Sequence, residues 1–456
     1  MAQQGHAASR TPGATSEKDQ SPAEWPGFDG SYQKRVIEAA HSAFGERFRK
    51  GLAGDLARIR GRISPLGLPV LVRSDDEAIL RQFGSAYHRC IEAVARAWGE
   101  NEEVRQVVTL PPGVREIVAA DRELRPTRIH LCRLDLLLEP LGGFSVVETN
   151  ANCPGGLMSA GWASREWRSY LSKSGVETTA PLDHETRRWM ASWFIQTAEE
   201  ETGEALDFVV LLRWEGGNRL ELPGLATELR ELGVEAKEAD PRDLVRARDG
   251  SVSLDGRTVR YAYWKLGMRE LCEAGREMRK VLTAIRLRKL FVQNGISGRF
   301  VGDNKLCLAV LSDPSFDPLF DVEDIALIRR HLPWSRNAAR CGSPELETVL
   351  STPADYVLKR PLDTRGSGVV IGREISSPEA WEHAVAHAVR GHWLVQRFCE
   401  TTRLATRLSS LRCRPRQDLS LGLANGRLVG AMSRSSPELR TNVALRGCLH
   451  PVFMES

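Results

Sequence analysis

The chain has 456 residues, of which 42% are hydrophobic and 27% charged, and its 63 basic and 59 acidic side chains leave a formal net charge of +4. This length suffices for two or three domains with a buried core, and the near balance of charge argues against a nucleic-acid-binding protein. We expect no membrane partner, because no apolar run reaches the roughly 18 residues that a spanning helix needs.

Residues 1–28 are polar and contain no apolar stretch that could serve as a secretory signal, so we expect a disordered tail. The nine cysteines are scattered, and none forms a C-x-x-C pair. That usage predicts reduced thiols and a cytoplasmic protein.

Two helices are predicted after the tail, at residues 32–50 and 75–100, within a helical N-terminal region that spans residues 29–125. In the second helix, apolar side chains recur at helical spacing, and they predict a face that packs into a core. These side chains are Leu80, Phe83, Tyr87, Ile91, Val94 and Trp98.

A β-hairpin is predicted next, from two apolar runs at residues 128–138 and 144–149 and a Gly-containing loop between them. Further on, residues 208–212, 222–232 and 234–236 predict a βαβ unit. We interpret Gly216-Gly217 in that unit as a tight connection rather than a phosphate loop. A short hairpin at residues 254–257 and a basic helix around residues 270–290 complete this part of the chain.

The last third begins with a helix that is entered at Asp303 or Asn304 and stopped by Pro314. A strand, a Gly-rich turn and a second strand follow in residues 356–371. Beyond them come a helix at 378–389, the strand WLVQRF at 393–398, and a hairpin whose two-residue turn is Asn425-Gly426. The sequence has no internal repeat.

The Gly-rich turn is the first candidate site. Lys359 ends a buried strand, and Gly366, Ser367 and Gly368 lie in the turn that follows Arg365. Glycine backbone N–H groups can converge on an anion while the lysine supplies charge to phosphates. A plain hairpin with a glycine turn is the alternative.

The hairpin at residues 128–149 carries the second candidate site. Arg133 and Asp135 share one face because strand side chains alternate, and Glu148 and Asn150 share a face of the return strand. Two carboxylates and an amide oxygen suit Mg²⁺, and Arg133 could neutralise charge in phosphoryl transfer. The alternative is a salt bridge from Arg133 to one of the two acids.

Three weaker candidates remain. Lys305 lies at an expected helix start, where positive charge favours phosphate. Gln396 and Phe398 end the strand WLVQRF, which could hold a flat base by backbone hydrogen bonds and stacking. Arg434 and Asn442 lie in a Ser- and Arg-rich segment, and a solvated loop is the other interpretation.

Together these motifs resemble the ATP-grasp carboxylate–amine ligases, which carry a lysine followed by a Gly/Ser-rich loop, a hinge strand for adenine, and an Arg-x-Asp strand paired with Glu-x-Asn and Pro-Gly. Because the acidic strands precede the nucleotide-binding half, the order resembles the circularly permuted members related to glutathionylspermidine synthase. The resemblance covers roughly residues 130–445. It implies an α/β (α+β) ATP-grasp fold with a metal-binding part at 126–200, a Rossmann-like pre-grasp domain at 205–290 and a nucleotide-binding part at 291–456.

The resemblance also implies ligands and roles. ATP and Mg²⁺ would be bound, with Asp135, Glu148 and Asn150 holding the metal and Lys305 and Lys359 holding phosphates. The turn from Gly366 through Ser367 to Gly368 would close over the γ-phosphate, and Gln396 and Phe398 would hold the base. Arg133 and Arg434 would steady an acyl phosphate.

The reaction implied is ATP-dependent amide formation between a small carboxylate and an amine, such as an amino acid, peptide or polyamine, with release of ADP and phosphate. Two alternatives stay open: a catalytically silent nucleotide-binding relative and an ATP-dependent phosphotransferase.

Overall fold

The computed structural model describes residues 67–122, 127–140, 142–152, 154–173, 175–214, 221–364, 366–403, 415–441 and 448–455. The expected tail and the helix expected at residues 32–50 lie outside these residues. Within the described ranges, no helix is both long enough and apolar enough to cross a bilayer.

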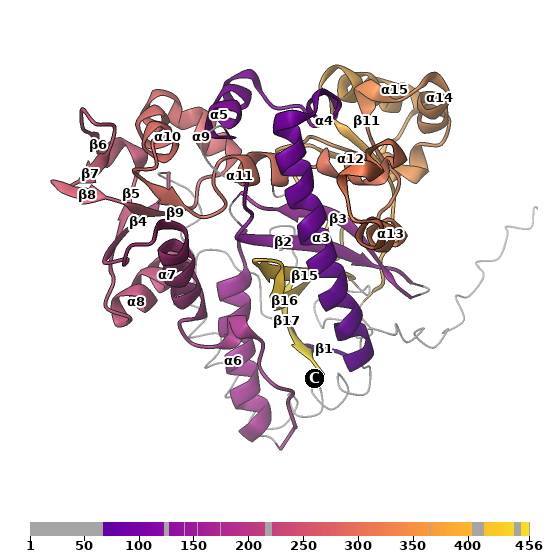
Figure 1. Cartoon of the computed structure of the whole chain (residues 1–456). Coiled ribbons are helices and arrows are strands. Elements are labelled where there is room, and N and C mark those ends of the chain that lie inside the picture. Colours follow the sequence, from indigo (N-terminus) through magenta and orange to yellow (C-terminus); the bar gives the residue numbers. More distant parts are fainter. Residues whose placement is uncertain are drawn as a thin grey trace, which may run out of the picture.

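A six-stranded sheet forms the centre of the molecule (Figure 1). In spatial order its strands are β1 (Val70–Val72), β17 (Cys448–Met454), β16 (Arg427–Ser436), β15 (Arg416–Ala424), β2 (Leu131–Leu138) and β3 (Phe144–Asn150). β1 is parallel to β17, and the other neighbours are antiparallel. The sheet therefore joins the expected hairpin β2–β3 to strands from the end of the chain. The hairpin β15–β16, with its turn at Asn425-Gly426, is confirmed.

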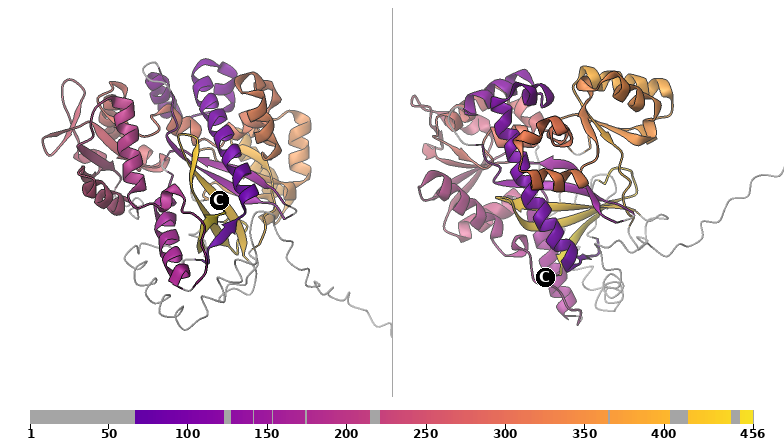
Figure 2. Two further views of the ribbon diagram at one scale, coloured as in Figure 1. Left: turned by 60° about the horizontal axis from the view of Figure 1, so that its bottom comes forward. Right: turned by 45° about the vertical axis from the view of Figure 1, so that its right-hand side comes forward.

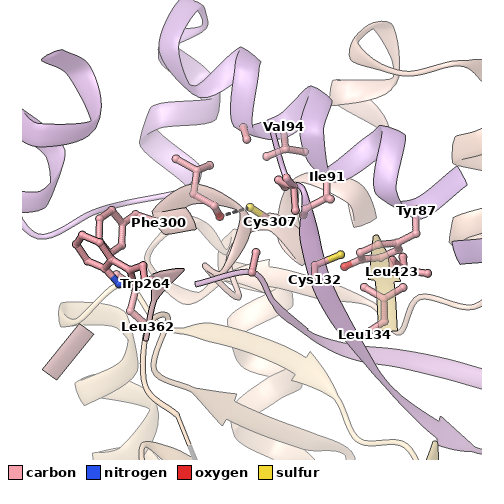
Figure 3. Close-up of a cluster of buried hydrophobic side chains, with 14 of the residues drawn as sticks. Tyr87, Ile91, Val94, Cys132, Leu134, Trp264, Phe300, Cys307, Leu362 and Leu423 are labelled. Atoms are coloured by element: carbon pink, nitrogen blue, oxygen red, sulfur yellow. Dashed lines mark hydrogen bonds between the residues drawn. The ribbon is translucent and has the colours of Figure 1, made fainter. Parts of the chain in front are cut away.

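Helix α3 (Ser74–Glu100) crosses one face of this sheet, as Figures 1 and 2 show. Its predicted apolar face is buried, and Figure 3 places Tyr87 in one cluster with Cys132 and Leu134 of β2. The Tyr87 hydroxyl also forms a 2.7 Å hydrogen bond with Thr149 Oγ1 of β3. The helix is thus confirmed, and it packs against one face of the hairpin β2–β3.

A second sheet of four parallel strands carries the predicted βαβ unit. Its order is β10 (Phe291–Val292), β9 (Tyr261–Trp264), β4 (Phe208–Leu212) and β5 (Glu235–Ala239). Helix α8 (Leu222–Glu231) joins β4 to β5, which confirms the unit. The Gly216-Gly217 loop lies outside the described residues.

Two helices replace the single basic helix expected at residues 270–290. They are α9 (Met268–Ala274) and α10 (Met278–Arg286), and the chain breaks at Gly275, whose φ is +47°. A positive φ cannot continue a right-handed helix, so the single-helix prediction was wrong.

A third, antiparallel sheet follows the order β11 (Ser335–Asn337), β14 (Leu394–Arg397), β12 (Tyr356–Lys359) and β13 (Val369–Ile371). β12 and β13 are the predicted strands on either side of the Gly-rich turn. Helix α15 (Pro378–Arg390) is also confirmed, and it packs on this sheet through the fully buried Trp381.

The remaining elements connect and cover these sheets. The helices are α4 (Glu102–Val107), α5 (Pro112–Arg122), α6 (Leu157–Lys173), α7 (Trp189–Thr202), α11 (Ser297–Gly302), α12 (Cys307–Ser312), α13 (Val322–Arg330) and α14 (Ser343–Ser351). A three-stranded ribbon contains β6 (Val245–Arg246), β7 (Val252–Leu254) and β8 (Arg257–Val259). The 3-10 turns are Asp183–Glu185, Pro241–Asp243, Gly275–Glu277, Pro314–Leu319, Ala338–Arg340, Pro353–Asp355 and Gly372–Glu374.

The helix expected from residue 303 or 304 begins later, at Cys307. Asn304 instead makes a turn in which its Oδ1 accepts the Leu306 N–H at 2.9 Å. Lys305 therefore lies in a turn just before a helix of only 6 residues.

Asn294 joins the hairpin β2–β3, named the acidic hairpin for its residues Asp135 and Glu148, to the rest of the fold. It is fully buried with a φ of +66°, and its side chain accepts the Leu131 N–H at 2.8 Å and donates to the carbonyls of Leu131 (2.6 Å) and Ala151. One side chain thus satisfies backbone groups at the start of β2 and the end of β3.

Replacing Asn294 by alanine should lower the free energy of unfolding by about 3 kcal/mol, because buried backbone groups lose their partners. Asn425→Ala is the matched control, since Asn425 also has a positive φ (+47°) but is exposed, and it should cost only about 1 kcal/mol. Denaturant unfolding of the two variants measures both values. Equal losses would show that the hydrogen bonds of Asn294 contribute nothing beyond backbone strain.

Candidate functional site

The acidic hairpin presents its polar side chains as the alternation predicts. Arg133 pairs with Asn150 and Asp135 pairs with Glu148 across β2 and β3, with a bulge just after Asp135. These four side chains therefore belong to one face of the hairpin. The structure brings them together as a group.

Asp135 lies at the centre of a hydrogen-bonded network and is 5% exposed. Its Oδ1 accepts from Arg133 Nε at 2.8 Å and from Ser420 Oγ at 2.9 Å. Its Oδ2 accepts from Arg133 Nη2 at 3.0 Å, Arg434 Nη2 at 3.0 Å and Asn150 Nδ2 at 3.3 Å. The salt bridge that the sequence left as an alternative is present together with a second one.

Asp418 of β15 is a second carboxylate that accepts hydrogen bonds from Arg434. The Arg434 N–H donates to Oδ1 at 2.7 Å, and the guanidinium Nε donates to Oδ2 at 2.9 Å. Thr441 Oγ1 donates to the same Oδ2 at 2.7 Å. Asn442, which was a candidate together with Arg434, lies outside the described residues.

The charged groups in this network shift one another's pKa values. Burial alone would raise the pKa of Asp135, but Arg133 and Arg434 outweigh it and hold that pKa well below its ordinary value. For Asp418, burial prevails and raises the pKa although Arg434 opposes the shift. The pKa of Arg434 is raised, because the two carboxylates outweigh its burial. Two arginines and two aspartates thus form a charge-balanced cluster.

Asp418 and Ser420 were missed by sequence analysis. The available signal was two polar residues at alternate positions in the otherwise apolar strand DLSLGL. Both side chains are buried, and buried polar groups require partners.

Lys305 reaches across to the acidic hairpin. Its Nζ lies 3.0 Å from Glu148 Oε1 and donates to the Asp363 carbonyl at 2.6 Å. Burial alone would lower the pKa of Lys305, but Glu148 and Asp303 outweigh it and raise that pKa. Asp363 also contributes negative charge, so a lysine and several carboxylates face one another here.

Lys359 is the second lysine to reach β3. Its Nζ donates to the Val147 carbonyl at 3.0 Å and to Gln396 Oε1 at 2.6 Å, both neutral acceptors. Burial lowers the pKa of Lys359 to about 8, with Glu148 opposing the shift and Lys305 adding to it. An ammonium group held by neutral acceptors keeps its charge available to an anion.

The Gly-rich turn follows directly on Lys359. Gly366 (φ +75°) and Gly368 (φ +67°) are left-handed, and the Gly368 carbonyl accepts the Arg360 N–H at 2.8 Å. A Cβ at Gly368 would lie 2.7 Å from Arg360 Cβ, so both the positive φ and this close approach favour glycine there. Ser367 closes the turn through its N–H and hydroxyl, which both donate to the Thr364 carbonyl. Arg365 lies outside the described residues.

Gln396 and Phe398, the residues expected to hold a base, already have partners within the protein. Gln396 is buried, and it donates through Nε2 to Ser335 Oγ at 3.0 Å while it accepts from Lys359. The Phe398 N–H donates to the Asp355 carbonyl at 2.7 Å, and the Arg373 guanidinium lies 4.0 Å from the centre of the Phe398 ring. One face of that ring is therefore already covered by a cation.

Glu148 and Asn150 are the residues whose chemistry fits a magnesium ion best. The Glu148 side chain is 27% exposed, and Asn150 donates through Nδ2 to Asp135, so its Oδ1 is the atom that could accept a cation. Mg²⁺ commonly takes one or two protein ligands together with waters and substrate phosphates. Among the described residues, no group of three or more His, Cys, Asp and Glu side chains is arranged to hold a metal.

An open hollow of about 550 Å³ lies against β5, away from these residues. Its lining includes Arg230, Lys237, Glu238, Asp243 and Asp255. The charges there are mixed in sign, and the hollow gives no reason to move the candidate site.

Comparison with known proteins supports the fold. No protein-family model and no curated protein matches the chain. Among solved structures, a glutathione synthetase-like effector from Globodera pallida, determined in its apo form, is similar with a TM-score of 0.58. The match covers 92% of this chain and 96% of the effector at 14% sequence identity. The chain therefore has a mixed α/β fold like that of a glutathione synthetase-like protein.

Proposed function

We propose that the protein is an ATP-grasp carbon–nitrogen ligase, in circularly permuted order, that joins a small carboxylate to an amine. The observation that carries this proposal is the approach of Lys305 and Lys359 to β3, at Glu148 Oε1 and the Val147 carbonyl, each at 3.0 Å. Two lysines, a glycine turn and an acidic strand then surround one region, which suits a nucleotide polyphosphate and a cation.

In this proposal the three parts of the chain have separate tasks. Residues 126–200 supply the metal-binding part, residues 205–290 the pre-grasp domain, and residues 291–456 the nucleotide-binding part. The strands β15 to β17 of the last part complete the sheet that carries the acidic hairpin, so the first and last parts share one core.

The side chains would act mainly by charge and position. Lys305 and Lys359 would hold the phosphates of ATP, the turn at residues 366–368 would cover the γ-phosphate, and Gln396 and Phe398 would border the base. Glu148 and Asn150 would hold Mg²⁺, which supplies charge neutralisation on the phosphates when bound.

Arg133 and Arg434 would orient the substrate carboxylate and then steady the acyl phosphate. A carboxylate oxygen attacks the γ-phosphorus and ADP leaves. The amine then attacks the acyl carbon, phosphate leaves, and the amine loses a proton as the amide forms.

A second candidate, a catalytically silent nucleotide-binding protein, is favoured by one observation. The oxygens of Asp135 already accept five hydrogen bonds, so one of the three expected metal ligands is engaged elsewhere. The charged lysines would still bind nucleotide in such a protein.

The test is a panel of amino acids, short peptides and polyamines incubated with ATP and Mg²⁺, read as phosphate release and product mass. We expect one carboxylate–amine pair to give ADP, phosphate and a product lighter by one water than the two substrates together. Nucleotide binding without turnover would favour the silent protein, and a stable phosphorylated product would indicate a phosphotransferase.

A further inference from the structure

The acceptor sites of the Asp135 carboxylate are all engaged in hydrogen bonds within the protein. An ionised carboxylate offers roughly four acceptor sites, and the two oxygens of Asp135 accept five donors at 2.8–3.3 Å. Mg²⁺ needs oxygen contacts at about 2.0–2.1 Å in a strict octahedron. A cation at that distance would displace these donors and lie beside two guanidinium groups of the same charge.

The geometry of the donors shows what Asp135 does instead. It lies on β2, opposite Ser420 of the central strand β15, and the side chain of Arg434 extends from β16 on the far side of that strand. Arg133 Nε and Nη2 hold the carboxylate as a fork, while its Nη1 donates to the Gly155 carbonyl at 2.6 Å. The carboxylate thereby fixes the planes of two arginines from separate strands.

We propose that Asp135 is a positioning residue that aligns Arg133 and Arg434 for an anionic substrate group, and that the cation is held without it. This inference rests on the proposed function, because the substrate group is the carboxylate or acyl phosphate of the ligase reaction. The two arginines keep N–H groups beyond those that Asp135, Asp418 and Gly155 accept, since each guanidinium has five. Those N–H groups are the ones that would contact the substrate.

The decisive comparison is between Asp135→Asn and Glu148→Gln in the full chain. Binding of Mn²⁺, with AMP-PNP present, is measured by electron paramagnetic resonance. We expect Glu148→Gln to weaken Mn²⁺ binding by about tenfold or more, whereas Asp135→Asn weakens it much less. A loss in Asp135→Asn equal to that in Glu148→Gln would overturn the positioning role.

The rate of ADP release gives the second readout. Asp135→Asn should lower kcat by about 100-fold through misaligned arginines, and the KM for ATP should change little because the lysines are untouched. In a double-mutant cycle, Asp135→Asn should add little to the loss already caused by Arg434→Gln, since both act through one arrangement. Additive losses would contradict the proposal.

Asp135→Asn leaves Arg434 and Arg133 with less negative charge between them, which could prevent folding. In that case the double variant Asp135→Asn/Arg434→Gln, which removes one charge of each sign, carries the Mn²⁺ measurement. If the wild-type protein binds neither AMP-PNP nor Mn²⁺ in the presence of AMP-PNP, the proposed function fails. If it binds both, and only the Asp135 variants lose the metal, the positioning role fails while the proposed function stands.

Discussion

Replacing Glu148 by glutamine should lower ATP-dependent ADP release by about 1,000-fold, which is the size of effect expected when charge stabilisation is removed from a transition state. Of the paired carboxylates Asp135 and Glu148 on the acidic hairpin, Glu148 is the one that remains partly exposed, and it lies 3.0 Å from Lys305. The amide keeps the shape of the side chain but loses the charge that would hold the cation and orient the lysine. Release of ADP over time, with saturating ATP, measures the effect.

The control for this change is Glu347→Gln on the exposed side of α14, which removes the same charge away from the site. It should leave ADP release unchanged. Both variants should keep the wild-type circular dichroism spectrum, because Glu148 is not part of the apolar core. Unaltered ADP release in Glu148→Gln would exclude the assignment of the acidic hairpin to catalysis.

Replacing Lys359 by methionine should weaken nucleotide binding by about 10- to 100-fold, since a hydrogen bond to a charged group contributes roughly 1.5–3 kcal/mol. Methionine retains the apolar stem and removes the ammonium group, which, among the residues that the structure describes, donates only to neutral acceptors. Calorimetric titration with ADP measures the dissociation constant. Lys289→Met, at a half-exposed lysine beside Asp249, is the control and should not alter it.

The pH dependence of nucleotide binding provides a further test of the role of Lys359. Because burial lowers the pKa of Lys359 to about 8, the charged form predominates below that pH and is lost as pH rises through it. An anionic ligand binds the charged form better, so nucleotide affinity should decrease as pH rises through about 8 in the wild-type protein. The decrease should be absent in Lys359→Met, and a decrease that persists in this variant would show that another group is responsible.

The sequence predicted those helices and strands whose residue patterns are local, that is, confined to neighbouring residues in the chain. Helix α3 follows from apolar spacing, the hairpins β2–β3 and β15–β16 follow from alternation and turn residues, and the βαβ unit follows from its order. The three-residue strand β1 gave no such signal, because a parallel pairing with β17 at the opposite end of the chain cannot be read locally. The break at Gly275 was missed because a single glycine is tolerated in many helices.

The candidate site was predictable to the same extent. Sequence spacing placed Arg133 with Asp135 on a face of one strand and Glu148 with Asn150 on a face of the return strand, and the strand register brings these two faces together. It could not predict that Asp135 would meet Arg434, since that contact depends on β15 lying between β2 and β16. The burial of Asp418, and its hold on Arg434, came from the same sheet order.

The sequence by itself determined which residues alternate on the acidic hairpin, where the Gly-rich turn lies, and which side of the helix at residues 75–100 packs into a core, because each depends on backbone periodicity over short distances. Only the tertiary structure decided which charges meet. It paired Lys305 with Glu148, left Lys359 with neutral acceptors, and surrounded Asp135 with donors. The physical reason is that side-chain electrostatics act over a few ångströms in space, and residues that close together can be hundreds of positions apart along the chain.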